Sequence, residues 1–374
     1  MRGIHGPIGL AVFTQCGVGG YPRAVPFRLA MLTPFGPPAA RGNAVTVSRI
    51  ARGLSERGVD LRLWDLSVAS AGTVQRELEA YQPSLIHAFH GYRVGPVALT
   101  LAQRVEAPLV VTLTGTDANH DLFDAERAPV VRRVLEGSTR ITVFDWSVAE
   151  RVIAAAPSLA PRIVVVAQAV RWLTIDSFDL QTRWPQPSSA VLFVLPAGLR
   201  AVKDPLFPLG PLGRLVQAIP QIRLVYAGPV LERPIGRALE EALSPLSWAR
   251  YLGELPHAQM ASLLSQADVV LSCSISEGGM SNAVLEALSL GRAVLASDID
   301  GHRSIVTDGV TGLLYRDPVA FERRAAELAR DSALRERLGR AGAALVAERF
   351  APSRELDGYG AIYDELAPAR SSAS

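Results

Sequence analysis

Lysine is nearly absent from this sequence. Among the 38 lysines and arginines of its 374 residues, only Lys203 is a lysine. Exposed lysines and arginines often replace each other, so genome composition explains much of this bias. An ammonium group is nevertheless a compact point charge that the planar guanidinium does not reproduce. The one lysine that remains is therefore a candidate functional residue.

Other scarce features exclude whole classes of protein. The two cysteines, Cys16 and Cys273, are too few for a disulfide framework or a cysteine-based metal cluster. No apolar run approaches the roughly 18–20 residues that span a bilayer. A formal charge of +2 gives no long-range field to attract nucleic acid. We therefore expect a cytoplasmic protein with no membrane segment and no nucleic-acid partner.

Several functional motifs are also missing. The sequence has no G-x-G-x-x-G after its first strand-like run, no G-x-x-x-x-G-K-[ST] and no G-x-S-x-G. The histidines at positions 87, 90, 257 and 302 have no histidine four residues away, which argues against a metal site. These absences argue against dinucleotide, P-loop and serine-hydrolase chemistry, and we expect neither a metal nor another cofactor.

Short β-branched runs alternate with helical patterns along most of the chain. Such alternation is typical of parallel sheets that are covered by helices on both faces. The strand-like runs are 27–33, 61–64, 85–89, 109–113, 141–144 and 163–167, and then 191–195, 222–227, 250–252, 269–273 and 293–296.

The alternation is interrupted at 182–189, a segment rich in Pro, Ser and Gln that we predict to be a linker. At about 150 residues per domain, the length also indicates two domains. We predict an α/β protein with Rossmann-like domains at 27–181 and 190–350, which face a central cleft. Residues 351–374 are predicted to be a C-terminal helix and tail. Residues 1–26 are expected to be a leader outside the fold.

Two doubly wound domains bind ligands between them, at the carboxyl ends of strands and the N-termini of helices. The most informative loop of this kind is 276–281 (SEGGMS), which precedes a predicted helix at 282–290. Its glycines and the helix N-terminus suit an anion, and Glu277 and Glu286 could accept hydrogen bonds from sugar hydroxyls. An ordinary strand–loop–helix connection would explain the same residues.

A second loop, 196–205 (PAGLRAVKDP), follows the first predicted strand of the second domain. Arg200 and Lys203 lie three residues apart after Gly198 and are suited to hold a diphosphate, the arginine as a fork and the lysine as a point charge. The alternative is a pair of solvated cations.

Two loops of the first domain complete the set. Residues 112–121 (TLTGTDANHD) carry Asp117, which would orient a sugar hydroxyl or cap a helix. Residues 36–43 (GPPAARGN) precede the first predicted helix, and they either face the cleft or form a tight turn.

Taken together, these loops resemble those of the family-4 retaining glycosyltransferases, which have the GT-B fold. The resemblance extends from about residue 27 to 366, and it implies that C-terminal helices pack back on the first domain. It is strongest at 276–301 (SEGGMSNAVLEALSLGRAVLASDIDG), which is similar to that family's glutamate–glutamate signature. The combination of GN, TGTD and GLR..KDP is most similar to two subgroups, the glycosyltransferase 1 domain-containing proteins and the selenosugar synthases.

The resemblance implies a set of site residues. Arg200 and Lys203 would bind the diphosphate of a nucleotide-sugar, Glu277 would contact the donor sugar near its reacting carbon, and Asp117 would face the sugar or the acceptor. Glu286 would hold the ribose. The other implied donor-binding residues are Gly42, Asn43, Gly198, Leu255 in the nucleobase loop 253–255, Gly278, Gly279, Met280, Ser281 and Asn282.

The sequence departs from the family pattern at three places. Glu277 and Glu286 enclose eight residues, whereas the family's two glutamates enclose seven. Thr114 stands where many members have histidine, and Asn43 replaces the usual second glycine. The first change bears on the placement of Glu277, and the others on donor contacts and the choice of acceptor.

The expected function is metal-independent transfer of a sugar, with retention of configuration, from a UDP- or GDP-sugar to a small acceptor. One alternative is a selenosugar or thiosugar synthase, in which selenophosphate or a sulfur nucleophile is the acceptor. The other is a non-catalytic nucleotide-sugar binding protein. A two-domain ligand-binding receptor is disfavoured, because the sequence has no recognisable signal peptide.

Overall fold

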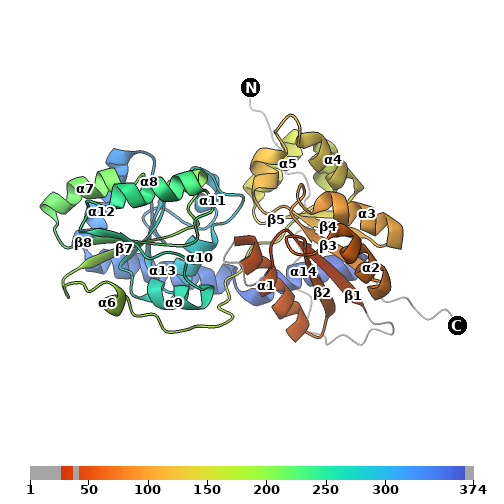
Figure 1. Ribbon diagram of the computed structural model, residues 1–374, viewed down its shortest axis with the longest axis horizontal. Coiled ribbons are helices and arrows are strands. Elements are labelled where there is room, and N and C mark those ends of the chain that lie inside the picture. The colour runs from red at the N-terminus through yellow and green to blue at the C-terminus, as the bar shows by residue number, and fades with distance from the viewer. Residues whose placement is uncertain (1–26, 37–41, 367–374) are drawn as a thin grey trace, which may run out of the picture.

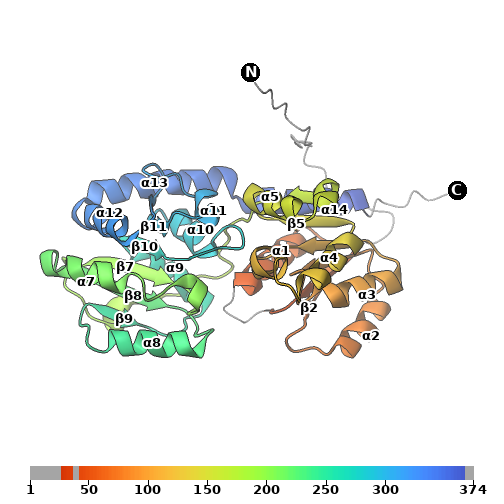
Figure 2. The ribbon, with the colours of Figure 1, turned by 90° about the horizontal axis from the view of Figure 1, so that it is seen from above.

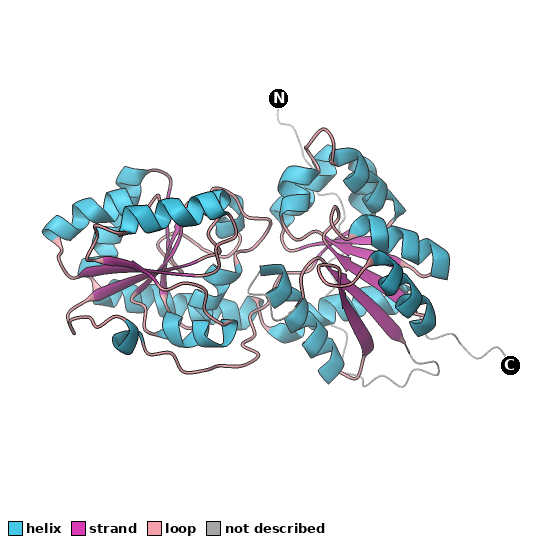
Figure 3. Cartoon of the chain, viewed as in Figure 1, coloured by secondary structure: helices cyan, strands magenta, loops and turns pink. Residues whose placement is uncertain are grey.

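The computed structural model describes residues 27–36 and 42–366. The expected leader at 1–26, the end of the tail and part of the 36–43 loop therefore lie outside the described residues. The described chain forms two α/β domains side by side (Figures 1 and 2). In each domain a sheet lies between layers of helices (Figure 3).

Two parallel sheets of six strands form the centres of the domains, within the described residues. Their strand orders are β2-β1-β3-β4-β5-β6 and β12-β11-β10-β7-β8-β9. The strands of the first are β1 (Arg28–Thr33), β2 (Asp60–Asp65), β3 (Leu85–Phe89), β4 (Leu109–Thr112), β5 (Arg140–Val143) and β6 (Ile163–Val165). Those of the second are β7 (Val191–Pro196), β8 (Ile222–Ala227), β9 (Ala249–Tyr251), β10 (Val269–Ser272), β11 (Ala293–Ser297) and β12 (Leu313–Tyr315).

Helices connect successive strands and cover both faces of each sheet. In the first domain they are α1 (Gly42–Glu56), α2 (Ala71–Tyr81), α3 (Gly95–Val105), α4 (Ala128–Gly137) and α5 (Trp146–Ala155), with short turns η1 (Asp117–Asp121) and η2 (Pro157–Arg162). The others are α6 (Leu180–Arg183), η3 (Ala201–Lys203), α7 (Leu209–Ala218), α8 (Arg233–Leu243), α9 (His257–Ser265), α10 (Asn282–Ser289), α11 (Asp300–Arg303), α12 (Pro318–Arg330), α13 (Ser332–Arg349) and α14 (Pro352–Leu366).

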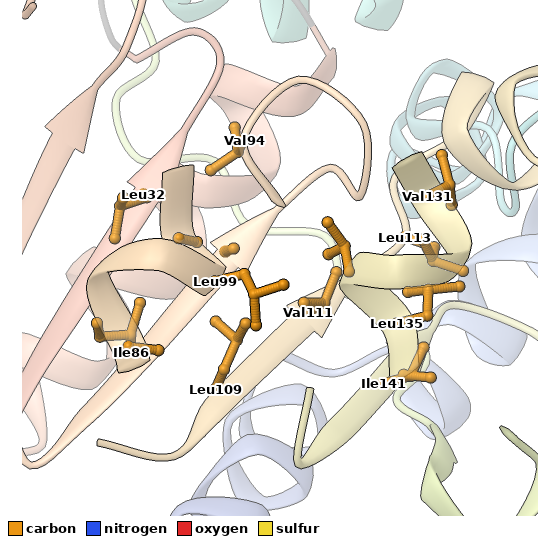
Figure 4. Packing of buried hydrophobic residues seen from close by; sticks show 14 of the residues in the cluster. Leu32, Ile86, Val94, Leu99, Leu109, Val111, Leu113, Val131, Leu135 and Ile141 are labelled. Atoms are coloured by element: carbon orange, nitrogen blue, oxygen red, sulfur yellow. The ribbon is translucent and has the colours of Figure 1, made fainter. Parts of the chain in front are cut away.

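Burial on both faces explains why the strands are apolar along their whole length rather than alternating. All five residues of β3 and all four of β4 are buried. Figure 4 shows one side of the first sheet, where Ile86, Leu109, Val111 and Ile141 of the strands pack with Leu99 of α3 and with Val131 and Leu135 of α4. Each such side chain contributes about 1.5–3 kcal/mol when it is fully buried.

The predicted α/β architecture of two Rossmann-like domains is confirmed. Each predicted strand is present within one or two residues of its expected position, and α14 begins at Pro352, one residue after the predicted start of the C-terminal helix and tail. The exception is β12, a strand of three residues at the sheet edge that we did not predict. Its pattern is too short to be distinguished from a loop by periodicity.

The chain crosses to the second domain after β6. The backbone N–H of Asp176 donates to the carbonyl of Ala258, and Phe178 and Leu180 belong to the core under α9 and α10. The predicted linker at 182–189 therefore follows residues that already pack on the second domain. We call residues 166–175 the crossing segment.

The C-terminal helix α14 returns to the first domain, as Figure 1 shows in blue. Leu356, Tyr359 and Tyr363 of α14 pack with β1 and α1. Arg49 of α1 forms a buried bidentate ion pair with Glu355, with distances of 2.8 and 2.7 Å. This return matches the expectation that C-terminal helices pack back on the first domain.

Candidate active site between the two domains

Glu277 lies in the loop 276–281 between β10 and α10, which we call the glutamate loop, at the carboxyl edge of the second sheet. Its carboxylate forms an ion pair with the ammonium of Lys203 and accepts a hydrogen bond from Ser274 Oγ at 2.7 Å. Burial raises the pKa of this carboxyl, but Lys203, together with His302 and Ser274, outweighs that effect and leaves the pKa below its usual value. Glu277 is therefore ionised at neutral pH although its side chain is only 9% exposed.

Lys203 ends the short turn η3 after β7, so neighbouring strands β7 and β10 bring it to Glu277. An ammonium has three donors, so the contact with Glu277 leaves donors for an anion. Arg200 lies at the start of the same turn. Its Nε is buried, and its guanidinium forms no hydrogen bond with another described residue. Lys203 and Arg200 therefore both retain N–H donors that could bind an anion.

Gly198, in the same loop, has a packing role. A Cβ there would lie 2.6 Å from Cδ1 of Leu231, so a larger residue would displace that side chain. This contact accounts for the glycine without any ligand.

The N-terminus of α10 faces the first domain. Ser281 is at the cap position but its side chain makes no capping hydrogen bond. Asn282 contacts α1 of the first domain, because its Nδ2 donates to the carbonyl of Gly42 and to Thr46 Oγ1, both at 3.3 Å. Gln168 of the crossing segment donates to Thr46 Oγ1 and Asn282 Oδ1. Three parts of the chain therefore meet at the start of this helix.

The loop after β4 in the first domain lies directly against the glutamate loop. A Cβ on Gly278 would lie 1.7 Å from the Cα of Gly115, and Gly115 has a positive φ of 150°. Gly278 is required because a side chain would overlap the backbone of Gly115, and Gly115 because residues with a side chain rarely adopt its φ. Asn119 Nδ2 also donates to the main-chain carbonyl of Glu277, and Arg151 donates to Asn119 Oδ1.

The next three residues of the glutamate loop pack against their surroundings. A Cβ on Gly279 would meet Phe144 at 3.2 Å, and its φ is +148°. Met280 packs on the second-domain core, and Ser281 is buried.

Asp117 is fully buried and serves its own loop in this structure. Its carboxylate accepts hydrogen bonds from the backbone N–H groups of Gly91, Thr114 and Gly115, at 2.8, 3.0 and 2.7 Å. These bonds hold the loop that contacts Gly278. Contact of Asp117 with a sugar or an acceptor stays a prediction.

Two of the departures noted in the sequence are adjacent in space. Asn43 Nδ2 donates to Thr114 Oγ1 at 3.1 Å. Their chain neighbours, Gly42 and Gly115, contact Asn282 and Gly278 of the second domain. Asn43 and Thr114 therefore lie on the first-domain side, opposite the glutamate loop.

Glu286 of α10 accepts a hydrogen bond from His257 Nε2 at 2.7 Å. The indole of Trp172 stacks on His257, with ring centroids 5.0 Å apart and an interplanar angle of 19°. The side chain of Leu255 is buried in the second-domain core.

The structure brings together most of the residues that the sequence singled out, and it adds Asn119, His257 and Trp172. These three were missed because their significance lies in contacts with residues distant in the sequence. Asn119 does stand next to the TGTD motif, which is the one signal that could have indicated it. Among the described residues there is no group of three or more His, Cys, Asp or Glu side chains arranged to hold a metal ion. Nor is any described helix both long enough and apolar enough to cross a membrane.

The chain is similar to known glycosyltransferases in sequence and in fold. Residues 193–331 match the family model described as Glycosyl transferases group 1. Glycosyltransferase 1 domain-containing protein 1 of Xenopus tropicalis is 28% identical over 308 residues, covering 80% of this chain and 87% of that protein.

Solved structures show the same fold. The Anabaena HepE structure in complex with UDP and glucose has a TM-score of 0.73 at 15% identity, covering 91% of this chain and 100% of that one. Sucrose-phosphate synthase from Thermosynechococcus elongatus has a TM-score of 0.78 at 18% identity, covering 91% and 99%.

The two-sheet architecture and these matches define an enzyme of the glycosyltransferase class with the GT-B fold. Within that class, residues 193–331 of the second domain are similar to the group 1 glycosyltransferases.

Proposed function

We propose that this enzyme transfers a sugar from a nucleotide diphosphate donor to a small acceptor with retention of configuration. The observation that carries the proposal is the ion pair of Lys203 with Glu277 at one edge of the second sheet. Arg200 begins the same turn as Lys203, and α10 starts five residues after Glu277 in the same loop. Cations and a helix N-terminus suit a diphosphate, and an ionised carboxylate suits sugar hydroxyls. The solved HepE complex with UDP and glucose makes UDP-glucose the first donor to test.

The difficult step is cleavage of the bond between the anomeric carbon and the oxygen of the β-phosphate. Positive charge develops on the sugar ring while negative charge develops on the leaving diphosphate. Arg200, the free donors of Lys203 and the backbone N–H groups at Asn282 would stabilise that negative charge. One such preorganised donor contributes about 3–4 kcal/mol. The proposal assigns this role to the protein's own groups rather than to a metal.

Retention follows if the acceptor attacks on the face from which the diphosphate departs. The acceptor oxygen forms the new bond to the anomeric carbon, and its proton passes to the departing phosphate oxygen. No strong protein base is then required. Glu277 would orient the donor sugar and offset the positive charge on its ring, because it is held ionised by Lys203.

The contact between Gly115 and Gly278 supports a role for the first domain in covering the donor. Loops that meet around a reacting centre exclude water and limit hydrolysis of the donor. The side chains that the first domain offers beside this contact include the neutral Asn43, Thr114 and Asn119. They would bind the acceptor or donor sugar through hydrogen bonds.

The test is to assay Lys203→Ala and Glu277→Ala with UDP-glucose, UDP-N-acetylglucosamine and GDP-mannose and a panel of small acceptors. We expect each variant to lose at least about 100-fold in turnover. The anomeric configuration of the product, measured by NMR, checks retention, and assays with EDTA check metal independence. Near-wild-type turnover in both variants would refute the proposal.

The neutral pair of Asn43 and Thr114 favours a second candidate, because an already ionised nucleophile needs no base. We therefore propose selenophosphate or a thiol as the alternative acceptor. Incubation with selenophosphate and UDP-N-acetylglucosamine, followed by mass spectrometry, would detect a selenium-containing sugar. Its absence beside productive transfer to an alcohol would exclude this candidate.

A further inference from the structure

Trp172 connects the crossing segment to the proposed nucleotide site. It stacks on His257, the first residue of α9, and it packs on the second-domain core around α9 and α10. Its indole N–H is buried and donates to no described residue. Stacking and apolar contact, rather than a hydrogen bond, therefore hold the indole in place.

His257 connects Trp172 to Glu286. The Nε2–H of His257 donates to Oε1 of Glu286 at 2.7 Å, and the two side chains are 27% and 12% exposed. Within the described residues, no hydrogen bond to Oε2 of Glu286 is present, so that oxygen is available to a ligand. A carboxylate fixed through one oxygen and open at the other is suited to accept a hydrogen bond from a hydroxyl of defined position.

We propose that His257 and Trp172 are positioning residues for the nucleotide: Trp172 fixes the imidazole of His257, and His257 fixes the carboxylate of Glu286 for the ribose hydroxyls. This inference rests on the proposed function, since it assumes that a nucleotide diphosphate binds beside α10. It goes further by assigning specificity for a ribose to a chain of three side chains. One of these comes from the segment that joins the domains, so the donor site is incomplete without that segment.

The contacts from Trp172 through His257 to Glu286 predict which substitutions weaken nucleotide binding most. Removal of the imidazole leaves Glu286 free to rotate, and removal of the indole leaves the imidazole free. Each step away from Glu286 should weaken the effect. Nucleotide binding should be retained by substitutions that keep these contacts. At position 257 this means a donor that reaches Glu286, and at position 172 it means an aromatic ring.

The experiment is calorimetric titration of UDP and 2′-deoxy-UDP into the purified chain and its variants. We expect His257→Ala to weaken UDP binding about fivefold to tenfold, which corresponds to one net hydrogen bond. His257→Gln, which keeps a donor, should stay within about threefold of wild type. Trp172→Ala should weaken binding about threefold to fivefold, and Trp172→Phe should stay within about twofold, because stacking is kept.

Two further measurements separate positioning from a general structural effect. In the Glu286→Ala background, His257→Ala should cause no further loss, because it acts through Glu286. The penalty of His257→Ala should also shrink with 2′-deoxy-UDP, which lacks one hydroxyl that Glu286 would bind. Trp248→Phe, a tryptophan on the other core of the second domain, is the control and should bind UDP like wild type.

The outcomes are distinguishable. If wild type binds UDP but His257→Ala and Trp172→Ala bind it equally well, this inference is overturned and the proposed function stands. Equal penalties with UDP and 2′-deoxy-UDP, or additive losses with Glu286→Ala, also overturn it. If wild type binds none of UDP, GDP, ADP and dTDP, the proposed function fails and this inference fails with it.

Discussion

The two sides of the domain interface carry different chemistry. The second domain contributes the ion pair of Lys203 and Glu277 and the hydrogen-bonded Glu286 and His257. It also contributes Arg200, whose guanidinium has no hydrogen-bond partner among the described residues. Beside the glycine contact, the first domain contributes mainly neutral groups, namely Asn43, Thr114 and Asn119. Its cation in this network, Arg151, donates to Asn119 and pairs with Asp300 of the second domain. The carboxylate of Asp117 in the same loop accepts hydrogen bonds from the backbone N–H groups of Thr114 and Gly115.

This difference suggests a division of roles. A leaving diphosphate needs fixed charges close to the bond that breaks, and in the proposed site the second domain supplies them through Lys203 and Arg200. The first domain provides shape and neutral hydrogen bonds, which can differ between relatives without disturbing that electrostatic arrangement. If the first domain acts mainly through close packing against the glutamate loop, substitutions that disturb this packing should reduce turnover more than nucleotide affinity.

The contact between the two sides should be the most sensitive point. In Gly278→Ala the new Cβ would lie 1.7 Å from Gly115 Cα, so the two loops must move apart. A displacement of about 1 Å at a reacting centre can cost about 100-fold in rate, and we expect at least that loss of turnover. UDP affinity, which depends on the second domain, should fall much less.

The control is Gly72→Ala on α2, where no atom lies within 4 Å of the added Cβ. It should leave turnover unchanged. Turnover of Gly278→Ala within tenfold of wild type would show that the loops need not meet during the reaction.

Loss of the Asp117 charge should destabilise the first-domain side. In Asp117→Asn one acceptor oxygen becomes an amide group, which cannot accept the backbone N–H groups it faces. We expect the free energy of unfolding to fall by about 2–3 kcal/mol, measured by urea denaturation. The exposed Asp124→Asn, which also faces backbone N–H groups, should change it by less than about 0.5 kcal/mol. Equal effects would contradict this reading of Asp117.

Acid should act on the two sides through different groups. Burial lowers the pKa of His87 in the first domain to about 3. The unfolded chain protonates this histidine below about pH 6.5, whereas the folded chain does not, so acidification destabilises the fold by up to about 1.4 kcal/mol per pH unit. At pH 4.5 this amounts to about 2–3 kcal/mol. Glu277 acts at lower pH, because its depressed pKa gives stability that is lost only as pH falls below the usual carboxyl range.

His87→Gln should therefore reduce the dependence of unfolding free energy on pH by up to one proton between pH 6.5 and 4.5. The measurement is urea denaturation at several pH values in that interval. His120→Gln, which alters an exposed histidine, is the control. An unchanged slope in His87→Gln would mean that other groups dominate acid unfolding.

The smallest effect is expected for the side-chain contact across the interface. Asn119→Ala removes the hydrogen bond to the carbonyl of Glu277. We expect turnover to fall about threefold to tenfold, with unchanged UDP affinity, because only closure is affected. Gln75→Ala removes a comparable exposed amide contact on α2 and should have no effect. A larger loss of UDP affinity than of turnover would place Asn119 in donor binding instead.

The sequence predicted the buried central strands but not the short edge strand β12. Runs such as 85–89 and 109–113 predicted β3 and β4 because strands buried on both faces must be apolar throughout. The sequence also located the glutamate loop and the loop 196–205 that carries Lys203, since both follow such strands. The three-residue β12 was not predicted, and neither was the early packing of Phe178 and Leu180 on the second domain.

The sequence by itself determined the strand and helix pattern, the two-domain organisation and the loops at the strand ends. These depend on local composition and periodicity. Only the tertiary structure decided which side chains meet: Lys203 with Glu277, 74 positions apart, and Asn119 with the Glu277 carbonyl, 158 positions apart. The stacking of Trp172 on His257 and the burial of Asp117 belong to the same class. Contacts of this kind depend on how two sheets and a crossing segment are placed in space, and local sequence patterns do not encode that placement.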